Sequence, residues 1–232
     1  MHKKAVLLLA AMTSCTHTLV GNGVPGQDNR PIPEVDSLSV SEDFHAVVSI
    51  GPRTSLTISG DDHLLSYVVT DVIGKRLVVH LPDNMSLDTS IPTRVELTVP
   101  SLVAVDASGA ATVDGTVGAT SKFHVTASGT ANIYLRGLDS AATSLEASGG
   151  AIVELRGRSG SANFDASGEA AVRGHALDTT DLVVEASGVA AVDAQANHSL
   201  SATISGSSLL QIWGNPPTRG LYTSGNARIR FR

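Results

Sequence analysis

The sequence predicts an all-β fold, a single-stranded parallel β-helix or β-solenoid with rungs of about 20 residues. Three observations lead to this prediction. The triplet Ala-Ser-Gly returns at nearly constant spacing, and alternate residues around each copy are small or apolar. Aromatic residues make up only 3% of the chain, so the core must consist of thin layers of Val, Ile, Leu and Ala.

Composition indicates that the chain folds and that nucleic acid is not its partner. The 232 residues are 42% hydrophobic and 16% charged, which is far from the composition of disordered chains. The net charge is −6, and it becomes more negative if the amino-terminal residues with Lys3 and Lys4 are removed. An acidic chain is a poor partner for a phosphate backbone, so we expect no binding to nucleic acid.

Residues 1–15 resemble a signal peptide with a lipobox-like end. Lys3 and Lys4 precede an apolar run over residues 5–12, which is too short to span a bilayer. The only cysteine, Cys15, follows at the end of this run. We expect lipidation of Cys15 and export to the cell envelope as an outer-membrane lipoprotein. The alternative is an ordinary secretory signal in which Cys15 is incidental.

The rest of the chain divides into a linker and one domain. Residues 16–33 are rich in Gly, Pro and Asn and are predicted to be a linker. Residues 34–232 are predicted to form a single β-solenoid domain. Within it, residues 34–100 lack the triplet but alternate in hydropathy, which indicates irregular first rungs. Residues 101–232 contain the Ala-Ser-Gly repeats.

The repeat has seven copies, two of them degenerate, with their serines 18 to 20 residues apart. These serines are Ser108, Ser128, Ser148, Ser167, Ser187, Ser205 and Ser224. With the glycine as position zero, small or apolar residues occupy positions −2, 0, +2 and +4, which predicts one inward-facing side of a strand. A second glycine follows most copies, so each rung is expected to contain two strands and two tight turns.

Stacking turns each sequence position into a column of side chains. The serine column is interpreted as a structural turn ladder in which hydroxyls bond neighbouring backbone groups and one another. No histidine keeps a fixed offset from these serines, so nothing indicates a nucleophile.

A second column, three residues before the glycine, is acidic. Its carboxylates are Asp106, Glu146, Asp165 and Glu185. Like charges on adjacent strands repel each other, which leaves three interpretations. The side chains could hold a cation such as calcium, contact a basic partner, or extend into solvent and pair with arginines such as Arg173.

A third column, five residues after the glycine, carries Glu154, Arg173 and Asp193 on consecutive rungs. Their alternating charge predicts a surface ion-pair ladder of modest stabilising effect.

Catalytic and metal sites are not indicated. The eight histidines lack metal-ligand spacing, so we expect no metal and no cofactor. The acidic column near Arg173 and the sequence Asp61-Asp62-His63 are the available acid–base clusters, and neither has the pattern of an active site. We therefore expect no catalytic residues.

The order of the motifs resembles a bacterial family described as putative autotransporter adhesin head domains, or head GIN domains. The resemblance covers nearly the whole mature chain and rests on motifs at residues 21–24 (GNGV), 44–51 (FHAVVSIG), 56–62 (LTISGDD), 75–79 (KRLVV) and 95–102 (VELTVPSL). It implies a β-helix related in shape to pectin lyases, a role in adhesion, and no established catalytic residues.

Together these observations predict a lipid-anchored, envelope-located β-solenoid that acts as a binding or adhesion module without catalysis. The expected partners are a polysaccharide or a surface protein, together with the membrane through the anchor, and we also expect a homo-oligomer. A polysaccharide-active enzyme and a structural envelope protein are the two alternatives.

Overall fold

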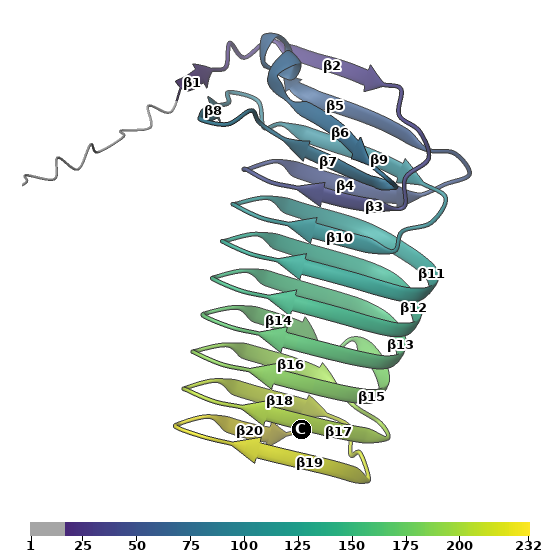
Figure 1. The fold of residues 1–232 in the computed structure, drawn as a ribbon, viewed down its shortest axis with the longest axis vertical. Helices are drawn as coiled ribbons and strands as arrows, with labels where there is room; N and C mark the ends of the chain where they lie inside the picture. Colours follow the sequence, from purple (N-terminus) through teal and green to yellow (C-terminus); the bar gives the residue numbers. More distant parts are fainter. Residues whose placement is uncertain (1–16) are drawn as a thin grey trace, which may run out of the picture.

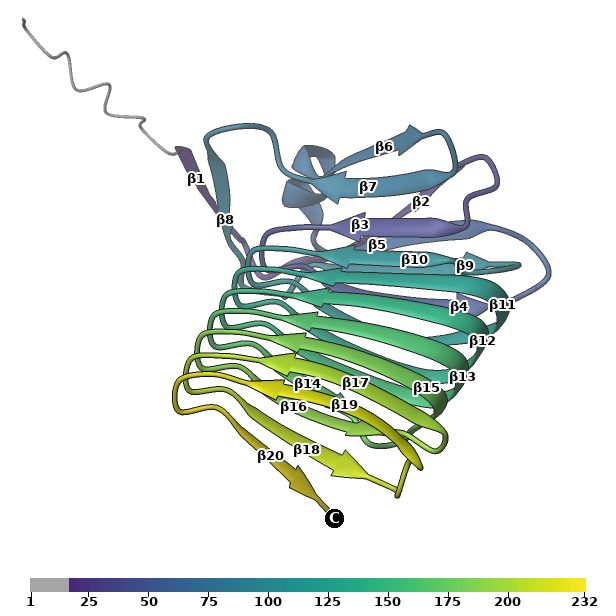
Figure 2. The same ribbon diagram turned by 60° about the horizontal axis from the view of Figure 1, so that its bottom comes forward.

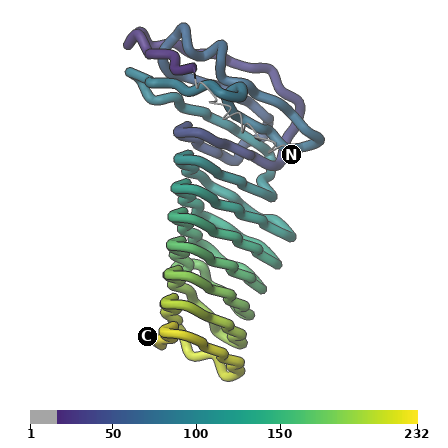
Figure 3. The backbone as a smooth tube through the Cα atoms, turned by 60° about the vertical axis from the view of Figure 1, so that its left-hand side comes forward, coloured from purple at the N-terminus to yellow at the C-terminus, as the bar shows by residue number. Residues whose placement is uncertain are grey.

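Residues 17–232 form a stack of parallel β-coils in the computed structural model, with only a short 3₁₀ helix besides strands (Figure 1). The predicted signal peptide and Cys15 lie outside these described residues. The coils follow one another along a single axis, from the N-terminal segments at one end to the last coil at the other (Figure 3). The all-β solenoid predicted from the repeat is thus confirmed.

One continuous, hydrogen-bonded sheet wraps around the core and has two long faces, which we call face A and face B (Figure 2). Face A contains β7 (Arg76–His80), β3 (Ser37–Val40), β10 (Ala104–Ala107), the second halves of β11, β12 and β13, then β15 (Leu177–Ala186), β17 (Ser199–Ile204) and β19 (Thr218–Thr223). Face B contains β9 (Arg94–Val99), β4 (His45–Ile50), the first halves of β11 (Thr112–Ala127), β12 (Asn132–Ala147) and β13 (Ile152–Ala166), then β14 (Ala171–Gly174), β16 (Ala191–Gln195), β18 (Leu209–Trp213) and β20 (Arg228–Phe231).

The Ala-Ser-Gly triplet forms the tight corner that joins face A to face B. In each repeat the serine N–H donates to a carbonyl of the preceding coil at 2.8 to 3.0 Å. The glycine that follows adopts a left-handed conformation, with φ of +71° at Gly168. The next residue donates to the glycine carbonyl of the preceding coil or, in the first repeat, to the carbonyl of Glu42, which is also left-handed. Every corner is therefore bonded to the one before it, which fixes the register of the stack.

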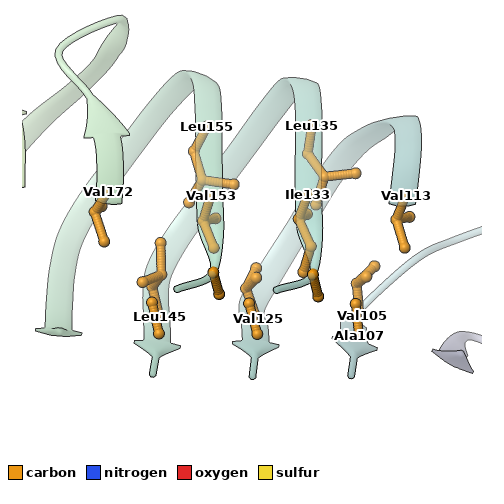
Figure 4. Close-up of a cluster of buried hydrophobic side chains, with 14 of the residues drawn as sticks. Val105, Ala107, Val113, Val125, Ile133, Leu135, Leu145, Val153, Leu155 and Val172 are labelled. Atoms are coloured by element: carbon orange, nitrogen blue, oxygen red, sulfur yellow. The ribbon is translucent and has the colours of Figure 1, made fainter. Parts of the chain in front are cut away.

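The core is a narrow layer between the two faces. Val105, Val125 and Leu145 from face A point toward Ile133 and Val153 from face B (Figure 4). All five side chains are completely buried. Since burying a residue such as Val or Leu stabilises a fold by about 1.5–3 kcal/mol, these paired rows account for much of the stability of the coils.

The inward register is as predicted at positions −2, +2 and +4 but wrong at the glycine itself. Ala166, Ala170 and Val172 are buried, whereas Gly168 is exposed at the corner. The glycine is required because of its left-handed backbone conformation and its close contact with the preceding coil. It is not required to prevent overpacking of the core.

The second tight turn of each rung is absent from the first three long strands. β11, β12 and β13 bend through Gly118, Gly137 and Gly157 without interruption, and they keep pairing across the bend. Only later coils break the strand, as between β14 and β15. Hydroxyls of Ser140, Thr143 and Ser159 bond one another at 2.7 to 3.0 Å inside this corner, where the sequence had not indicated a polar cluster.

The N-terminal end is a mixed cap. β1 (His17–Val20) pairs with β8 (Met85–Asp88), while β2 (Pro25–Arg30) lies antiparallel to β5 (Ser55–Asp61). The prediction of a linker over residues 16–33 is therefore wrong for His17–Val20 and Pro25–Arg30, because the backbone of these residues is paired in strands. Antiparallel pairing of β5 with β9 and of β6 (Val69–Ile73) with β7 closes the end of the core, and the 3₁₀ helix η1 (Asp62–Tyr67) joins β5 to β6.

The irregular first rungs predicted over residues 34–100 are out of chain order. The coil formed by β3 and β4 lies between the strands β7 and β9 on one side and the coil formed by β10 and β11 on the other. The chain thus forms an inner coil, leaves to build the cap, and returns past it to start the repeats.

Asp61 holds the cap together. Its side chain is buried, with 1% of its surface exposed, and accepts hydrogen bonds from the N–H groups of Gly23 at 2.6 Å, Ser90 at 2.9 Å and Ile91 at 3.0 Å. These bonds, the one from Ile91 foremost, lower the pKa of the carboxyl below its ordinary value of 3.8.

Substitution of the corner glycine tests this account of the repeat. We expect Gly168→Val to destabilise the fold by about 1–3 kcal/mol because its φ disfavours any side chain. A Cβ there would also lie 3.0 Å from the Gly149 carbonyl oxygen. Gly150→Ala is the control, since its Cβ would meet nothing nearer than 3.8 Å. Urea denaturation measures both, and equal losses would contradict the explanation.

Removing the Asp61 charge should loosen the cap. We expect Asp61→Asn to lower the melting temperature and to speed hydrogen exchange of the Gly23, Ser90 and Ile91 amides. A lowered pKa means that the carboxylate stabilises the fold above pH 3.8 and that this contribution is lost as the pH falls through the folded-state pKa. Asp88→Asn, at an exposed carboxylate on β8 of the same cap, is the control; the same acid sensitivity in both variants would contradict this role.

Candidate binding surfaces

The seven serines stack in a column at the corner, as predicted, but they bond the preceding coil through their backbone N–H groups and not through their hydroxyls. The seven turn serines, Ser108, Ser128, Ser148, Ser167, Ser187, Ser205 and Ser224, donate through N–H to the preceding coil. Within residues 17–232 their hydroxyls make no hydrogen bond to protein groups, contrary to the expectation of a hydroxyl ladder. The column is a turn motif in which a small residue precedes the left-handed glycine.

The acidic column lies on the outside of face A. The strand register puts Glu146 beside Asp165 and Asp165 beside Glu185, all exposed, and they form no ion pair among the described residues. Asp106 is separated from them by Thr126 and instead lies 3.1 Å from Nη1 of Arg76.

Two of the three interpretations of this column change. Arg173 is on face B, across the core, so it cannot neutralise the acidic column. In the part of the chain that the structure describes, no three His, Cys, Asp or Glu side chains come together as metal ligands do. The remaining interpretation is that the carboxylates extend into solvent or meet a basic partner.

A shallow groove of about 770 Å³ lies beside this column on face A. Its floor contains the small side chains of Ala104, Ala142 and Ser144, and Lys122 and His124 border it. The groove exists because outward positions that carry long side chains elsewhere on the face carry small ones here.

Face B presents a different surface, with alternating charges and aromatic rings. The outward column five residues after the glycine reads Asp114, Tyr134, Glu154, Arg173, Asp193, Gln211 and Arg230 in continuous register. Glu154 pairs with Arg156 at 2.6 Å and lies 4.0 Å from Arg173. The predicted ladder therefore ends at Arg173, and Asp193 takes other partners.

Those partners are His175 and Trp213. Asp193 accepts a hydrogen bond from Nε1 of Trp213 at 2.5 Å and lies 3.1 Å from Nδ1 of His175. The two rings are 6.0 Å apart and inclined by 40°. Trp213 nevertheless remains 44% exposed, so a large apolar ring is held in a fixed orientation at the surface.

Three hollows follow one another along face B. The first, of about 350 Å³, contains Tyr134 and Arg136; the second, of about 440 Å³, contains Arg173 and His175; and the third, of about 290 Å³, contains Arg228.

The second hollow has a simple origin in the sequence. Ala171 and Ala191 are adjacent in one outward column, between the larger Ile152 and Leu209. Two successive methyl side chains leave a recess between two ridges.

The sequence Asp61-Asp62-His63 is structural. Asp61 is the buried acceptor of the cap, and Asp62 accepts hydrogen bonds from the side-chain amide of Asn22 at 2.8 Å and from the N–H of His63 at 2.6 Å. The bond from Asn22 is the main cause that lowers the pKa of Asp62. Both carboxylates are thus engaged in holding the chain, and the cluster does not form an acid–base pair in a hollow.

Neutralising one carboxylate of the acidic column should stabilise the fold. We expect Asp165→Asn to raise the melting temperature by about 1–2 °C, because it removes repulsion from Glu146 and Glu185 on both neighbouring strands. Asp106→Asn is the control, since it removes an ion pair with Arg76 and should give no gain. Calcium should leave the melting temperature of the unmodified protein unchanged, and a clear rise would restore the cation interpretation.

None of the helices in the described part of the chain has the length and hydropathy needed to cross a bilayer. None of the curated proteins is detectably similar in sequence to the chain.

Solved structures with the same fold include proteins from Bacteroides and Parabacteroides species. A putative adhesin from Bacteroides fragilis superposes with a TM-score of 0.86 at 15% identity, covering 92% of this chain and 100% of that one. A putative lipid binding protein from Parabacteroides distasonis gives 0.77 at 15% identity, covering 93% and 99%. A putative adhesin from the same species gives 0.72 at 14% identity, covering 93% and 100%. At these identities the likeness shows the fold alone.

The family model described as "Putative auto-transporter adhesin, head GIN domain" matches residues 35–216. This match spans the inner coil, most of the cap and most of the repeats. The chain therefore belongs to the auto-transporter adhesin head GIN domain family.

Proposed function

We propose that this protein is an exported, envelope-located binding module of the adhesion type, anchored through a lipid on Cys15 and without catalytic activity. The family description and the descriptions of two structural neighbours, each a "putative adhesin", support the adhesion role. The signal-like residues 1–15 with their single cysteine support export and anchoring.

The observation that carries the proposal is the surface of face B. Its outward side chains lie in straight columns, and three hollows occur in succession along them. Because backbone bonds hold each coil to its neighbours, these columns are fixed before any ligand arrives, and binding costs little ordering. A long, rigid array of this kind suits an extended ligand such as a polysaccharide or a segment of a surface protein.

The chemistry of the described carboxylates favours binding over turnover. The shifted pKa values of Asp61 and Asp62 come from hydrogen bonds that hold the cap. Arg158 donates two hydrogen bonds of 2.7 Å to Asp139 and thereby lowers the pKa of that carboxyl, at a corner of the stack. Each of these pKa shifts comes from a hydrogen bond that holds the fold, so none of them indicates a catalytic acid or base. Glycoside cleavage, by contrast, needs two carboxyl groups that face one substrate bond.

The anchor has a direct test. In protein extracted from membranes, the amino-terminal peptide should begin at Cys15 and carry the added mass of the lipid. Cys15→Ser should leave the protein soluble after export. An unmodified Cys15 in membrane-extracted protein would contradict the anchor and favour an ordinary secretory signal.

The function has a separate test with two readouts. The full chain in detergent is incubated with a panel of neutral and acidic polysaccharides and with purified surface proteins, and both retention and release of new sugar ends are measured. We expect retention without release. Release of sugar ends would show an enzyme, and absence of retention throughout the panel, together with a weakened envelope on deletion, would show a structural protein.

A further inference from the structure

Charge is divided between the two faces of the solenoid. The outward carboxylates of face A are Asp106, Glu146, Asp165, Asp181 and Glu185. On face B the arginines outnumber the carboxylates. The arginines of face B and its edge are Arg94, Arg136, Arg156, Arg173, Arg228 and Arg230. The carboxylates of face B are Glu96, Asp114, Glu154 and Asp193. A chain with net charge −6 thus carries a positive face.

Several of these guanidinium groups have no partner. Within residues 17–232, Arg136, Arg228 and Arg230 make no ion pair or hydrogen bond through their side chains. Arg173 is half exposed, and its contact with Glu154 is 4.0 Å long. An exposed, unpaired guanidinium can bond a carboxylate through two parallel N–H groups, which is the strongest form of such recognition.

The first two hollows hold arginines beside aromatic rings, and the carboxylates of Asp114, Glu154 and Asp193 also line them. Tyr134 and Arg136 line the first hollow, and Arg173 lines the second. Trp213 adjoins the second hollow, because the Asp193 carboxylate that lines the hollow also holds its ring. An exposed ring offers a flat apolar surface to the C–H groups of a sugar, while arginine and glutamine bond its polar groups. The combination fits a ligand that has both sugar rings and negative charges.

We propose that face B binds an extended acidic polysaccharide, a polymer of uronic acids, which lies along the axis of the solenoid. Its carboxylates bond Arg136, Arg173 and Arg230, and one of its rings stacks on Trp213. Coils about 4.8 Å apart place the strands from β4 to β20 over about 34 Å, enough for several sugar units. This inference rests on the proposed binding function and names its ligand class and surface.

Face A is the less suitable surface for such a ligand. Glu146, Asp165 and Glu185 lie on adjacent strands beside its groove, and these carboxylates would repel an anionic polymer. The groove itself is lined by Asp181 together with Arg76 and Lys122. At its outward positions within the coils, face A also carries no Phe, Tyr or Trp before Tyr222 on β19, since Phe123 and Phe164 are buried in the core. Opposite charge on the two faces would also suit a second copy of the chain, so self-association is measured in the same experiment.

The single tryptophan makes binding directly observable, because all tryptophan emission comes from Trp213. Polygalacturonate, alginate and hyaluronate are titrated into the full chain in detergent. We expect at least one to change the emission, with an affinity that falls as salt rises. Methyl-esterified polygalacturonate has the same rings without the charges and should bind at least about tenfold more weakly. Inorganic polyphosphate supplies charge without sugar rings, so its retention should be the same for the unmodified protein and for Trp213→Ala.

Matched variants separate charge, stacking and shape, with retention on the immobilised polymer as the readout. Arg173→Gln should weaken binding about tenfold, whereas Lys75→Gln, which removes a cation at the cap, should not. Trp213→Ala should weaken binding, whereas Tyr222→Ala, at a more exposed ring on face A, should not. Ala191→Leu should weaken binding by filling the second hollow. Melting temperatures close to that of the unmodified protein show that each variant is folded.

The outcomes that overturn the inference are distinct from failure of the proposed function. Equal binding of the acid polymer and its ester would remove the role of charge. Binding of polyphosphate and polygalacturonate with equal affinity and no effect of Trp213→Ala would leave only charge attraction. Retention of neutral polysaccharides or of a surface protein alone would contradict the inference about the ligand but support the proposed binding function. No retention of any ligand would contradict both. Concentration-dependent self-association abolished by Arg173→Gln and by Glu185→Gln would assign face B to a second copy.

Discussion

The structure depends on the hydrogen bonds that join each Ala-Ser-Gly corner to the corner of the preceding coil. These bonds require the corner glycine to approach its neighbour closely, since a Cβ at Gly129 would lie 2.7 Å from the Gly109 carbonyl oxygen. They also require a left-handed conformation that other residues adopt only under strain. Once the corners are in register, the strands on both sides must be in register too. The buried rows of the core and the outward columns follow from that alignment.

In-register stacking has an electrostatic consequence. Whatever charge a repeat carries at one position lies about 4.8 Å from the charge at that position in the next coil. Face A keeps Glu146, Asp165 and Glu185 adjacent, at the cost of mutual repulsion in solvent. Face B alternates Glu154, Arg173 and Asp193, and its carboxylates are shared among arginine, histidine and tryptophan. The same fold therefore supports two surfaces of different character on a single thin core.

The sequence predicted the parts of the fold that depend on periodic, local information. Repeat spacing and two-residue alternation identified the coil, the corner and the inward positions such as Ala170 and Val172. The glycine was placed inward because alternation says nothing of a change in backbone conformation at the corner. The ordered strands over residues 17–30 were missed because their order comes from pairing with distant strands and not from their own Gly- and Pro-rich composition.

The candidate site shows the same division. The column containing Asp193 could be predicted, because it follows from the repeat alone. Its bond with Trp213 and its contact with His175 could not, because they join side chains of different columns whose rotamers depend on the folded surface. The hollow over Ala171 and Ala191 could not be predicted, because only the strand register shows that these two small side chains are adjacent.

The two ends of the stack differ in a way that bears on function. The antiparallel cap closes the N-terminal end of the core, whereas the last coil exposes Leu221 and Phe231, with Arg219 stacked 4.2 Å above the Phe231 ring. Unpaired strand edges invite pairing with another chain, and charged side chains at an edge oppose it. Arg228 and Arg230 are on the edge strand β20, so they oppose end-to-end growth of the stack. The same two arginines extend the positive charge of face B to the last coil, so the surface proposed for the acidic polysaccharide continues along the side of the stack as far as β20.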